Sequence, residues 1–188
     1  MNVDAFVNIL LILWGIFEIV NVRRHRPPDG AVVDRHSFAG MWIAIAVAFT
    51  LANLVRAWCQ AHHAILWPAS LQVLGLGLMG AGIGLRVYAI RMLGSRFTPR
   101  VTVQPGQTLV TTGPYRWVRH PTYTGLWLAL IGVGVTTRCG WAVLVLTGIP
   151  FMGLWYRMRV EEQVLTAFFG DAYRDYVQRT WRLIPFIY

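Results

Sequence analysis

Five long apolar segments dominate this sequence of 188 residues and restrict it to a helical fold in a membrane. About 20 apolar residues in a helix cross the ~30 Å core of a bilayer, where no water satisfies an open sheet edge. Hydrophobic residues make up 56% of the chain. We therefore predict an all-α integral membrane protein, a single domain over residues 1–188, with about five spans at 5–22, 38–58, 69–90, 122–137 and 141–156.

The distribution of arginines predicts the topology. The net charge is +9 and all 17 basic residues are arginines. They gather after the first, third and fifth segments, whereas the segment after the second has none and that after the fourth has one. By the positive-inside rule, the N-terminus lies outside and the C-terminus in the cytosol. Positive charge between apolar segments indicates topology and anionic headgroups rather than nucleic acid. A compact chain of this kind is typical of a bacterial inner membrane.

The beginning of the chain has a rival interpretation. A signal peptide would also be apolar, but no positive region precedes the first segment and no small-residue cleavage site follows it. We therefore expect a transmembrane helix there. Glu18, near its end, is either an interfacial residue or a functional one.

One polar, basic stretch at residues 113–125 leads directly into the fourth apolar segment. Gly113-Pro114 predicts a turn, and Pro121 suits the first turn of a helix because that position has no use for an N–H group. His120 and Tyr123 are three residues apart and would share a helix face. A helix start with free N–H groups, an imidazole and a phenol can hold a polar or anionic small molecule at the membrane surface.

The C-terminal region predicts a second polar element. Residues from 157 onward indicate an amphipathic helix that continues from the fifth span, until Gly170 ends or bends it. The predicted topology puts this helix on the same face as the long loop at 91–121, so His120, Tyr123, Arg157 and Glu161 can meet. Arg157 and Glu161 are four residues apart and form either an ordinary interfacial ion pair or part of a functional cluster.

Three weaker patterns carry little functional weight. Residues 75–80 match a dinucleotide-binding fingerprint, but no strand precedes them and no acidic residue follows at about twenty positions, so we expect no Rossmann fold. The glycines at 75, 77, 80, 82 and 84 instead predict close helix packing. His62-His63 lacks a third ligand nearby, and we expect no metal site. Cys59 and Cys139 both fall on the predicted outer side, which allows a disulfide, although the unpaired state is the favoured interpretation.

Two ordered sets of residues resemble the isoprenylcysteine carboxyl methyltransferase family. The first is Leu109 to Tyr115 followed by Arg119-His120-Pro121-Thr122-Tyr123-Thr124-Gly125. The second comprises Glu161-Glu162, Leu165, Phe169-Gly170, Tyr173, Tyr176 and Arg182-Leu183-Ile184-Pro185. The resemblance covers about the last ninety residues, and the first half matches only as a set of apolar segments. The wider group includes phospholipid N-methyltransferases and, more distantly, sterol reductases.

The resemblance implies a membrane enzyme that uses S-adenosylmethionine and carboxyl-methylates an isoprenylcysteine-like lipophilic acceptor entering from the bilayer. The cytosolic loop and the C-terminal helix would form the cofactor pocket. Arg157 would face the acceptor as the catalytic residue. Carried over by position, the cofactor residues are Gln107, Thr108, Leu109, Val110, Tyr115, His120, Pro121, Thr122, Tyr123, Glu161 and Glu162. Gln107 replaces a residue that is often His in the family, and the acidic run is shorter here, so either Glu161 or Glu162 contacts the cofactor.

The residue types suit this chemistry. A Glu can pair with the ammonium of the cofactor, and Tyr115 and Tyr123 can pack on its adenosine. Methyl transfer mainly needs alignment and exclusion of water. A carboxylate acceptor needs no general base, whereas an amine must lose a proton that only His120 or a Glu could accept. The alternatives are a phospholipid or other lipophilic amine or thiol acceptor, a related NADPH-dependent reductase, and a membrane protein without enzymatic activity.

Overall fold

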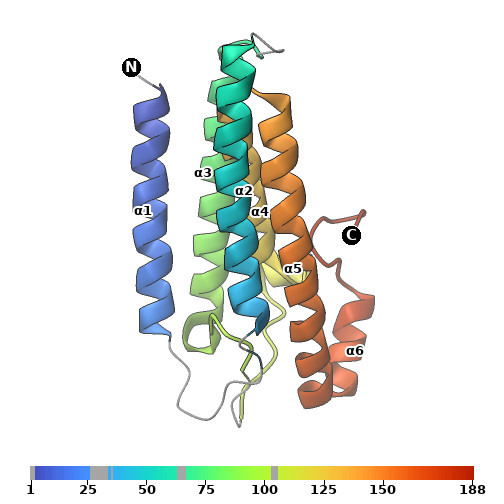
Figure 1. Ribbon diagram of the computed structural model, residues 1–188. Helices are drawn as coiled ribbons and strands as arrows, with labels where there is room; N and C mark the ends of the chain where they lie inside the picture. The colour runs from blue at the N-terminus through green and yellow to red at the C-terminus, as the bar shows by residue number, and fades with distance from the viewer. Residues whose placement is uncertain (1–2, 26–33, 35, 63–66, 103–105) are drawn as a thin grey trace.

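The computed structural model describes residues 3–25, 34, 36–62, 67–102 and 106–188 and is helical almost throughout these ranges. The five long helices run side by side, with α1 at one edge (Figure 1). In chain order the elements are α1 (Val3–Arg24), α2 (His36–Ala61), α3 (Ser70–Leu93), η1 (Gly94–Arg96), η2 (Gly113–Arg116), α4 (Pro121–Thr136), α5 (Gly140–Phe169) and α6 (Asp171–Gln178). The predicted all-α fold is confirmed.

Four of the helices, α1, α2, α3 and α5, are long and apolar enough to cross a membrane. The predicted fourth span, at 122–137, corresponds to α4, which has only 16 residues. At 1.5 Å per residue it extends about 24 Å, less than a bilayer core. It packs against α3 and α5, and 12 of its 16 residues are buried. The preceding residues do not lengthen it, because His120 has a non-helical backbone, with φ −122° and ψ 57°, and the N–H groups of Arg119 and His120 donate to the carbonyls of Trp181 and Arg182.

Glycines allow α3 and α4 to approach at backbone distance. A Cβ on Gly82 would lie 2.6 Å from the carbonyl oxygen of Gly125, and a Cβ on Gly132 would lie 2.6 Å from that of Gly75. No side chain fits at such separations. The predicted role of the α3 glycines in helix packing therefore holds for Gly75 and Gly82, whereas a Cβ would meet open space at Gly77, Gly80 and Gly84.

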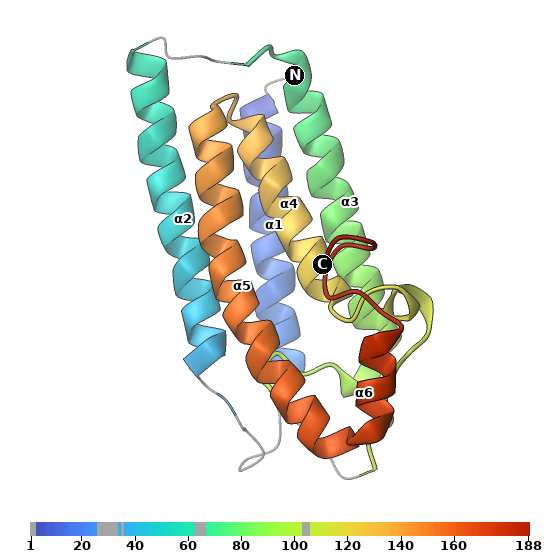
Figure 2. The same ribbon diagram turned by 90° about the vertical axis from the view of Figure 1, so that its right-hand side faces the viewer.

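The polar segments collect at one end of the bundle. There α5 continues as one helix to Phe169, and Gly170, with a positive φ of 58°, turns the chain into α6. Figure 2 shows α6 folding back beside the lower part of α5, next to the segment that leads into α4. The segment after α6 pairs with residues 117–120, since the Trp181 N–H donates to the Trp117 carbonyl over 3.0 Å. This pairing fixes the start of α4.

The opposite end of the bundle contains both cysteines. The structure joins Cys59, at the end of α2, to Cys139, just before α5, in a disulfide with a Cα–Cα distance of 6.6 Å. The expectation that they are unpaired is therefore wrong. The two cysteines are 80 residues apart, and only the packing of α2 against α5 brings them together.

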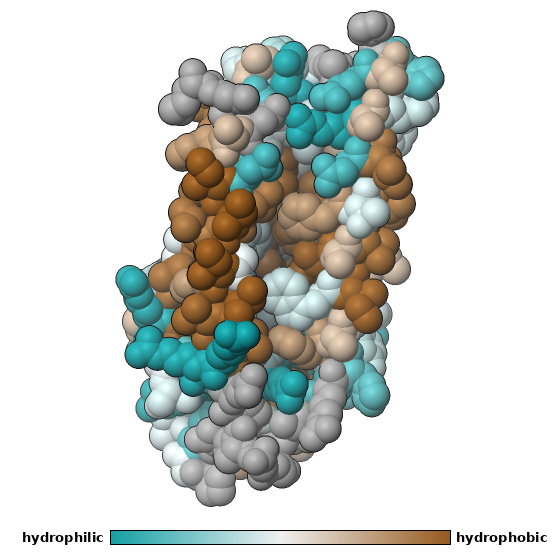
Figure 3. Space-filling view, turned by 60° about the vertical axis from the view of Figure 1, so that its left-hand side comes forward, coloured by the Kyte–Doolittle hydropathy of each residue, from teal (hydrophilic) through white to brown (hydrophobic). Residues whose placement is uncertain are grey.

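The outer surface of the helices is apolar. Along α1 it includes six large apolar residues that are at least half exposed, namely Ile9, Ile12, Leu13, Ile16, Ile19 and Val20. Viewed with α1 brought forward, hydrophobic ridges run along the molecule and a hollow lies between them (Figure 3). Such a surface suits contact with lipid chains rather than with water.

Candidate active site

A cavity at the polar end of the bundle receives side chains from α1 to α6 and from the loop after α3. Nine residues predicted to bind a cofactor line it: Gln107, Thr108, Leu109, Val110, Tyr115, His120, Thr122, Tyr123 and Glu161. Arg157, the predicted catalytic residue, lines it too. Pro121 and Glu162 are not among the lining residues. The cavity therefore contains most of the predicted residues, although they come from segments far apart in the sequence.

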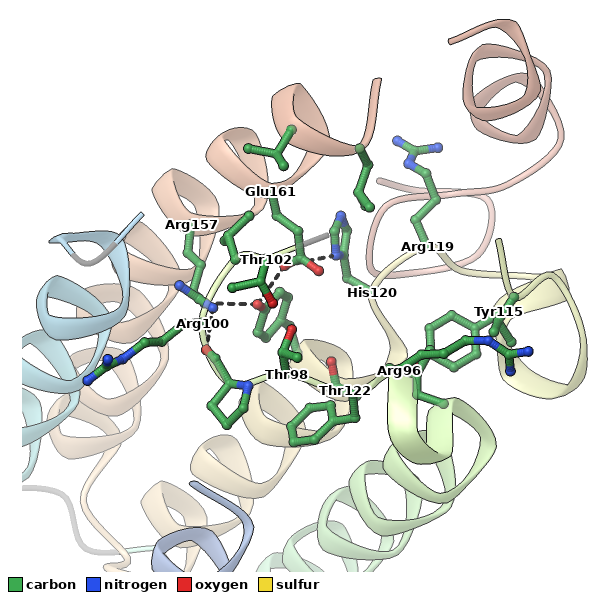
Figure 4. A pocket seen from close by; sticks show the side chains of 18 of the residues that line it. Arg96, Thr98, Arg100, Thr102, Tyr115, Arg119, His120, Thr122, Arg157 and Glu161 are labelled. Atoms are coloured by element: carbon green, nitrogen blue, oxygen red, sulfur yellow. Dashed lines mark hydrogen bonds and ion pairs between the residues drawn. The ribbon is translucent and has the colours of Figure 1, made fainter. Parts of the chain in front are cut away.

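His120, Tyr123, Arg157 and Glu161 meet in this cavity, as the sequence predicted (Figure 4). The Tyr123 hydroxyl donates to Glu161 Oε2 over 2.6 Å and accepts from Arg157 Nε over 2.9 Å. His120 Nδ1 lies 4.0 Å from Glu161 Oε2, and its ring stacks on Tyr123 with centroids 5.5 Å apart. Tyr123 thus links the two charged groups of α5. The Glu161 side chain keeps 29% of its surface exposed, so its carboxylate can receive a further donor.

Arg157 is held firmly by the protein. The residue is only 2% exposed, and its guanidinium lies 5.5 Å from the centre of the Phe38 ring. Besides the Tyr123 hydroxyl, it donates to Ser37 Oγ over 2.9 Å and to the Pro99 carbonyl over 2.5 Å. A guanidinium has five N–H groups, so two form no bond to the described residues beyond these three and can meet a ligand. Arg157 consequently ties α2, α4 and the loop after α3 to α5.

Asp34 supports the same cluster from the start of α2. It accepts hydrogen bonds from the Ser37 hydroxyl and from the backbone N–H of Ser37 at 3.2 Å. Burial alone would raise the pKa of Asp34, but the bonds from Ser37 and His36, together with the charge of Arg157, outweigh it and lower the pKa below the usual value. A charged Asp34 therefore fixes the hydroxyl that contacts Arg157.

Glu162 differs from its neighbour Glu161, because it points into a cluster of basic side chains. It accepts from Arg119 Nε at 3.1 Å and from Arg182 Nη2 at 2.6 Å. His120 Nε2 lies 3.2 Å from Glu162 Oε1, so the imidazole stands between the two glutamates. Glu162 thus has little capacity left for a ligand and holds His120 in place, whereas Glu161 faces the cavity.

The tyrosines of the C-terminal helix form one end of the cavity. Tyr173 and Tyr176 of α6 line it beside Tyr115, and the Tyr176 hydroxyl donates to the Tyr115 carbonyl over 2.6 Å. Burial raises the pKa of all three phenols, which therefore stay protonated and can donate. The sequence had assigned no role to Tyr173 or Tyr176 beyond the family resemblance.

A buried ion pair in the cavity wall was not predicted. Arg86 of α3 contacts Glu18 of α1 through Nε and through Nη2, the latter at 2.7 Å, and donates to the Thr122 carbonyl over 3.0 Å. The sequence left Glu18 as either an interfacial or a functional residue. In the structure it is buried inside the bundle and lines the cavity. Arg86 lies inside the predicted span 69–90, and an ionisable residue within a span is by itself a sign of function. That signal was available in the sequence.

Three buried polar atoms in the cavity wall have no hydrogen-bond partner among the described residues. They are Asn21 Nδ2, Thr102 Oγ1 and the Tyr173 hydroxyl. A buried donor without a partner costs about 1–3 kcal/mol, and such groups are uncommon in folded proteins. Their position in one cavity indicates that a polar ligand completes their hydrogen bonds.

Comparisons with a family model and with individual known proteins point to the same family. The model of the isoprenylcysteine carboxyl methyltransferase family matches residues 73–167. A protein-S-isoprenylcysteine O-methyltransferase of Rattus norvegicus is 36% identical over 153 residues, which cover 75% of this chain and 48% of the relative. That of Tribolium castaneum is 35% identical over 116 residues, which cover 61% and 41%.

The structural comparison extends the similarity to the fold. The solved structure of a eukaryotic intramembrane Ras methyltransferase superposes with a TM-score of 0.65 at 32% identity. The match covers 82% of this chain and 55% of the other. The chain thus spans about half the length of the relatives that it matches.

Proposed function

The chain belongs to the isoprenylcysteine carboxyl methyltransferase family, and from this membership we propose that it methylates the carboxylate of a lipophilic, isoprenylcysteine-like acceptor with S-adenosylmethionine. The observation that carries the proposal is the hydrogen-bonded series from Glu161 through Tyr123 to Arg157 inside the cavity. It places Glu161, which can accept hydrogen bonds from a cationic group, beside Arg157, which can donate to an anionic one.

The donor set of the cavity fits S-adenosylmethionine. The cofactor carries an ammonium, a carboxylate and an adenosine, and its sulfonium makes the methyl group electrophilic. The exposed part of Glu161 can accept from an ammonium. Two buried donors without partners, Thr102 Oγ1 and the Tyr173 hydroxyl, suit oxygen or nitrogen acceptors. The aromatic faces of Tyr115 and Tyr173 suit a purine.

In the proposed reaction Arg157 orients the acceptor carboxylate with the N–H groups that have no acceptor among the described residues. A carboxylate is already nucleophilic, so no side chain has to remove a proton from it. The Tyr123 hydroxyl holds the Arg157 guanidinium at a fixed position relative to Glu161. The acceptor carboxylate at Arg157 is thereby oriented relative to the cofactor at Glu161. Burial of Arg157 at 2% exposure keeps water from competing for the guanidinium.

The lipophilic part of the acceptor is proposed to enter from the bilayer between α1 and α2. Val22 of α1 and Phe38, Met41 and Trp42 of α2 line the cavity on that side. The polar end of the bundle carries the arginine-rich segments, and in the proposed orientation, within a bacterial inner membrane, it faces the cytosol with the C-terminus. The cofactor would then arrive from the cytosol.

The test is calorimetric binding of S-adenosylhomocysteine to the protein in lipid nanodiscs, followed by methyl uptake into N-acetyl-S-farnesylcysteine. Glu161→Gln should weaken binding at least tenfold, about the contribution of one charge-assisted hydrogen bond, without lowering Tm. Asp175→Asn, which changes an exposed acid of α6, is the matched control and should bind as the wild type does. Equal binding by Glu161→Gln would refute the site, and a folded protein that neither binds nor methylates would refute the function.

A further inference from the structure

The wall that α1 contributes to the cavity contains one turn of polar side chains. Trp14 Nε1 donates to Glu18 Oε1 over 3.0 Å, and Glu18 also pairs with Arg86. Asn21 follows Glu18 by three residues and therefore lies on the same face of the helix. The acidic and basic groups of this wall satisfy each other, so neither Glu18 nor Arg86 offers a free charge to a ligand.

Asn21 is the exception on this wall. The residue is 8% exposed and lines the cavity, and its amide Nδ2 is buried without a hydrogen-bond partner among the described residues. A carboxamide can donate two hydrogen bonds. Close to the hydrocarbon core there is little water to occupy such a donor, so its burial is unfavourable unless a ligand supplies an acceptor.

The surroundings of Asn21 define what that ligand resembles. Val22, Met41 and Trp42 line the same side of the cavity, and the surface with α1 brought forward is hollowed between hydrophobic ridges (Figure 3). In Figure 4 the blue ribbon of α1 lies on the opposite side of the cavity from Glu161 and His120. The wall that contains Asn21 is thus the apolar side of the cavity, away from Glu161, where the lipophilic part of an amphiphile would lie.

We propose that Asn21 is a specificity residue, whose amide donates to an uncharged oxygen of the methyl acceptor, such as the carbonyl of an amide attached to the carbon next to its carboxylate. This inference rests on the proposed methyl transfer to a lipophilic acid. It narrows the acceptor class from any prenylated acid to acids that carry such an oxygen. Arg157 would orient the acceptor carboxylate, while Asn21 donates a hydrogen bond to the uncharged oxygen of the acceptor.

The experiment compares two acceptors that differ by the amide alone. N-acetyl-S-farnesylcysteine has it, and S-farnesyl-3-mercaptopropionic acid lacks it. Methyl transfer from S-adenosylmethionine is measured for both in nanodiscs, with wild type, Asn21→Leu and Asn8→Leu. Asn8 is exposed on the same helix, so its variant controls for the loss of an amide from α1. The wild type and Asn8→Leu should prefer the amide-bearing acid by roughly three- to tenfold in kcat/KM, the range expected for one hydrogen bond.

Asn21→Leu should reduce that preference to less than twofold, mainly through KM, while S-adenosylhomocysteine binds as before. It should also raise Tm in the absence of acceptor, because a buried donor without a partner is removed. Retention of the preference by Asn21→Leu, or its absence in the wild type, would overturn the inference and leave the methyltransferase function standing. A protein that binds S-adenosylhomocysteine but methylates neither acid would refute the proposed acceptor and the inference together.

Discussion

The two walls of the cavity are held together in different ways. The wall built by α4, α5, α6 and the segment before α4 is closed by many polar bonds, with Glu162 accepting from Arg119 and Arg182 and the backbone of residues 117–120 paired with residues 181–182. Among the residues that the structure describes, the wall built by α1 and α2 has few such bonds. Its main links are the ion pair of Glu18 with Arg86 and the bond from Arg157 to Ser37.

This difference suits the two ligands proposed for the cavity, a cofactor and a lipid chain. We call the wall of α4, α5 and α6 the closed wall and that of α1 and α2 the open wall. A cofactor of fixed shape needs side chains held to a fraction of an ångström by their own partners, and the closed wall provides them. A lipid chain needs an apolar surface that can open toward the bilayer. On this side α1 has few contacts with the other helices, and an element of that kind moves at low cost in free energy, whereas α2 packs closely on α5. We therefore expect substitutions in the closed wall to affect folding and cofactor binding, and those in the open wall to affect binding of the acceptor.

The largest effect is expected at the helix contact that carries the closed wall. Gly82→Leu puts a side chain where a Cβ alone would lie 2.6 Å from the Gly125 carbonyl. Since backbone cannot move aside, α3 and α4 must separate, and we expect loss of several kcal/mol and little folded protein. Gly84→Leu on the same helix, where a Cβ meets open space, is the control for thermal unfolding in detergent. Equal Tm values for the two variants would show that α4 does not depend on this contact.

Adjacent glutamates provide the next comparison. Glu162→Gln removes the charge that compensates Arg119 and Arg182, and we expect it to lower the free energy of unfolding by about 3 kcal/mol. Glu161→Gln should change stability by less than about 1 kcal/mol, because its main bond comes from the neutral Tyr123 hydroxyl. Unfolding of both variants in denaturant checks this difference. The reverse order of stabilities would mean that Glu161, not Glu162, holds the closed wall together.

Much of this arrangement could be predicted from the sequence, because it follows from local patterns. Apolar segments of sufficient length indicated the helices, and the arginine distribution indicated which loops share an end. The spacing of His120 and Tyr123, and of Arg157 and Glu161, then sufficed to predict their convergence. Each of these predictions depends on residues close in the chain or on a rule about the membrane.

The remaining features depend on how helices are rotated and paired in space. Glu161 and Glu162 are separated by about 100° around α5, and only the position of α6 and the C-terminal segment decides which one faces the cavity. The pair of Glu18 with Arg86 spans 68 residues, and the disulfide of Cys59 with Cys139 spans 80. A single sequence contains no direct signal for such contacts. The position of Arg86 inside a predicted span did indicate that this residue needs a partner in the bundle.

A smaller effect is expected for the ion pair that holds α1 in the open wall. Glu18→Gln leaves the Arg86 charge buried with weaker acceptors, which we expect to cost about 2 kcal/mol. In the double variant Glu18→Leu with Arg86→Met both charges are gone, and stability should return close to that of the wild type. Thermal unfolding of the single and the double variant beside the wild type measures this difference. If the double variant were as unstable as the single one, Arg86 would matter through its bond to the Thr122 carbonyl rather than through α1.

The smallest effect is expected where the walls meet, at Ser37. Ser37→Ala removes one of three protein acceptors of Arg157, while the Tyr123 hydroxyl and the Pro99 carbonyl remain. A hydrogen bond to a charged group contributes about 1.5–3 kcal/mol. Because the other two acceptors keep Arg157 in place, we expect only part of it, about 1 kcal/mol, to appear as a roughly fivefold higher KM for the proposed acceptor. If the walls work separately, affinity for S-adenosylhomocysteine should stay within about twofold, since Tyr123 still joins Arg157 to Glu161. An equal loss of both affinities would show that α2 orders the whole cluster, and the division into an open and a closed wall would not hold.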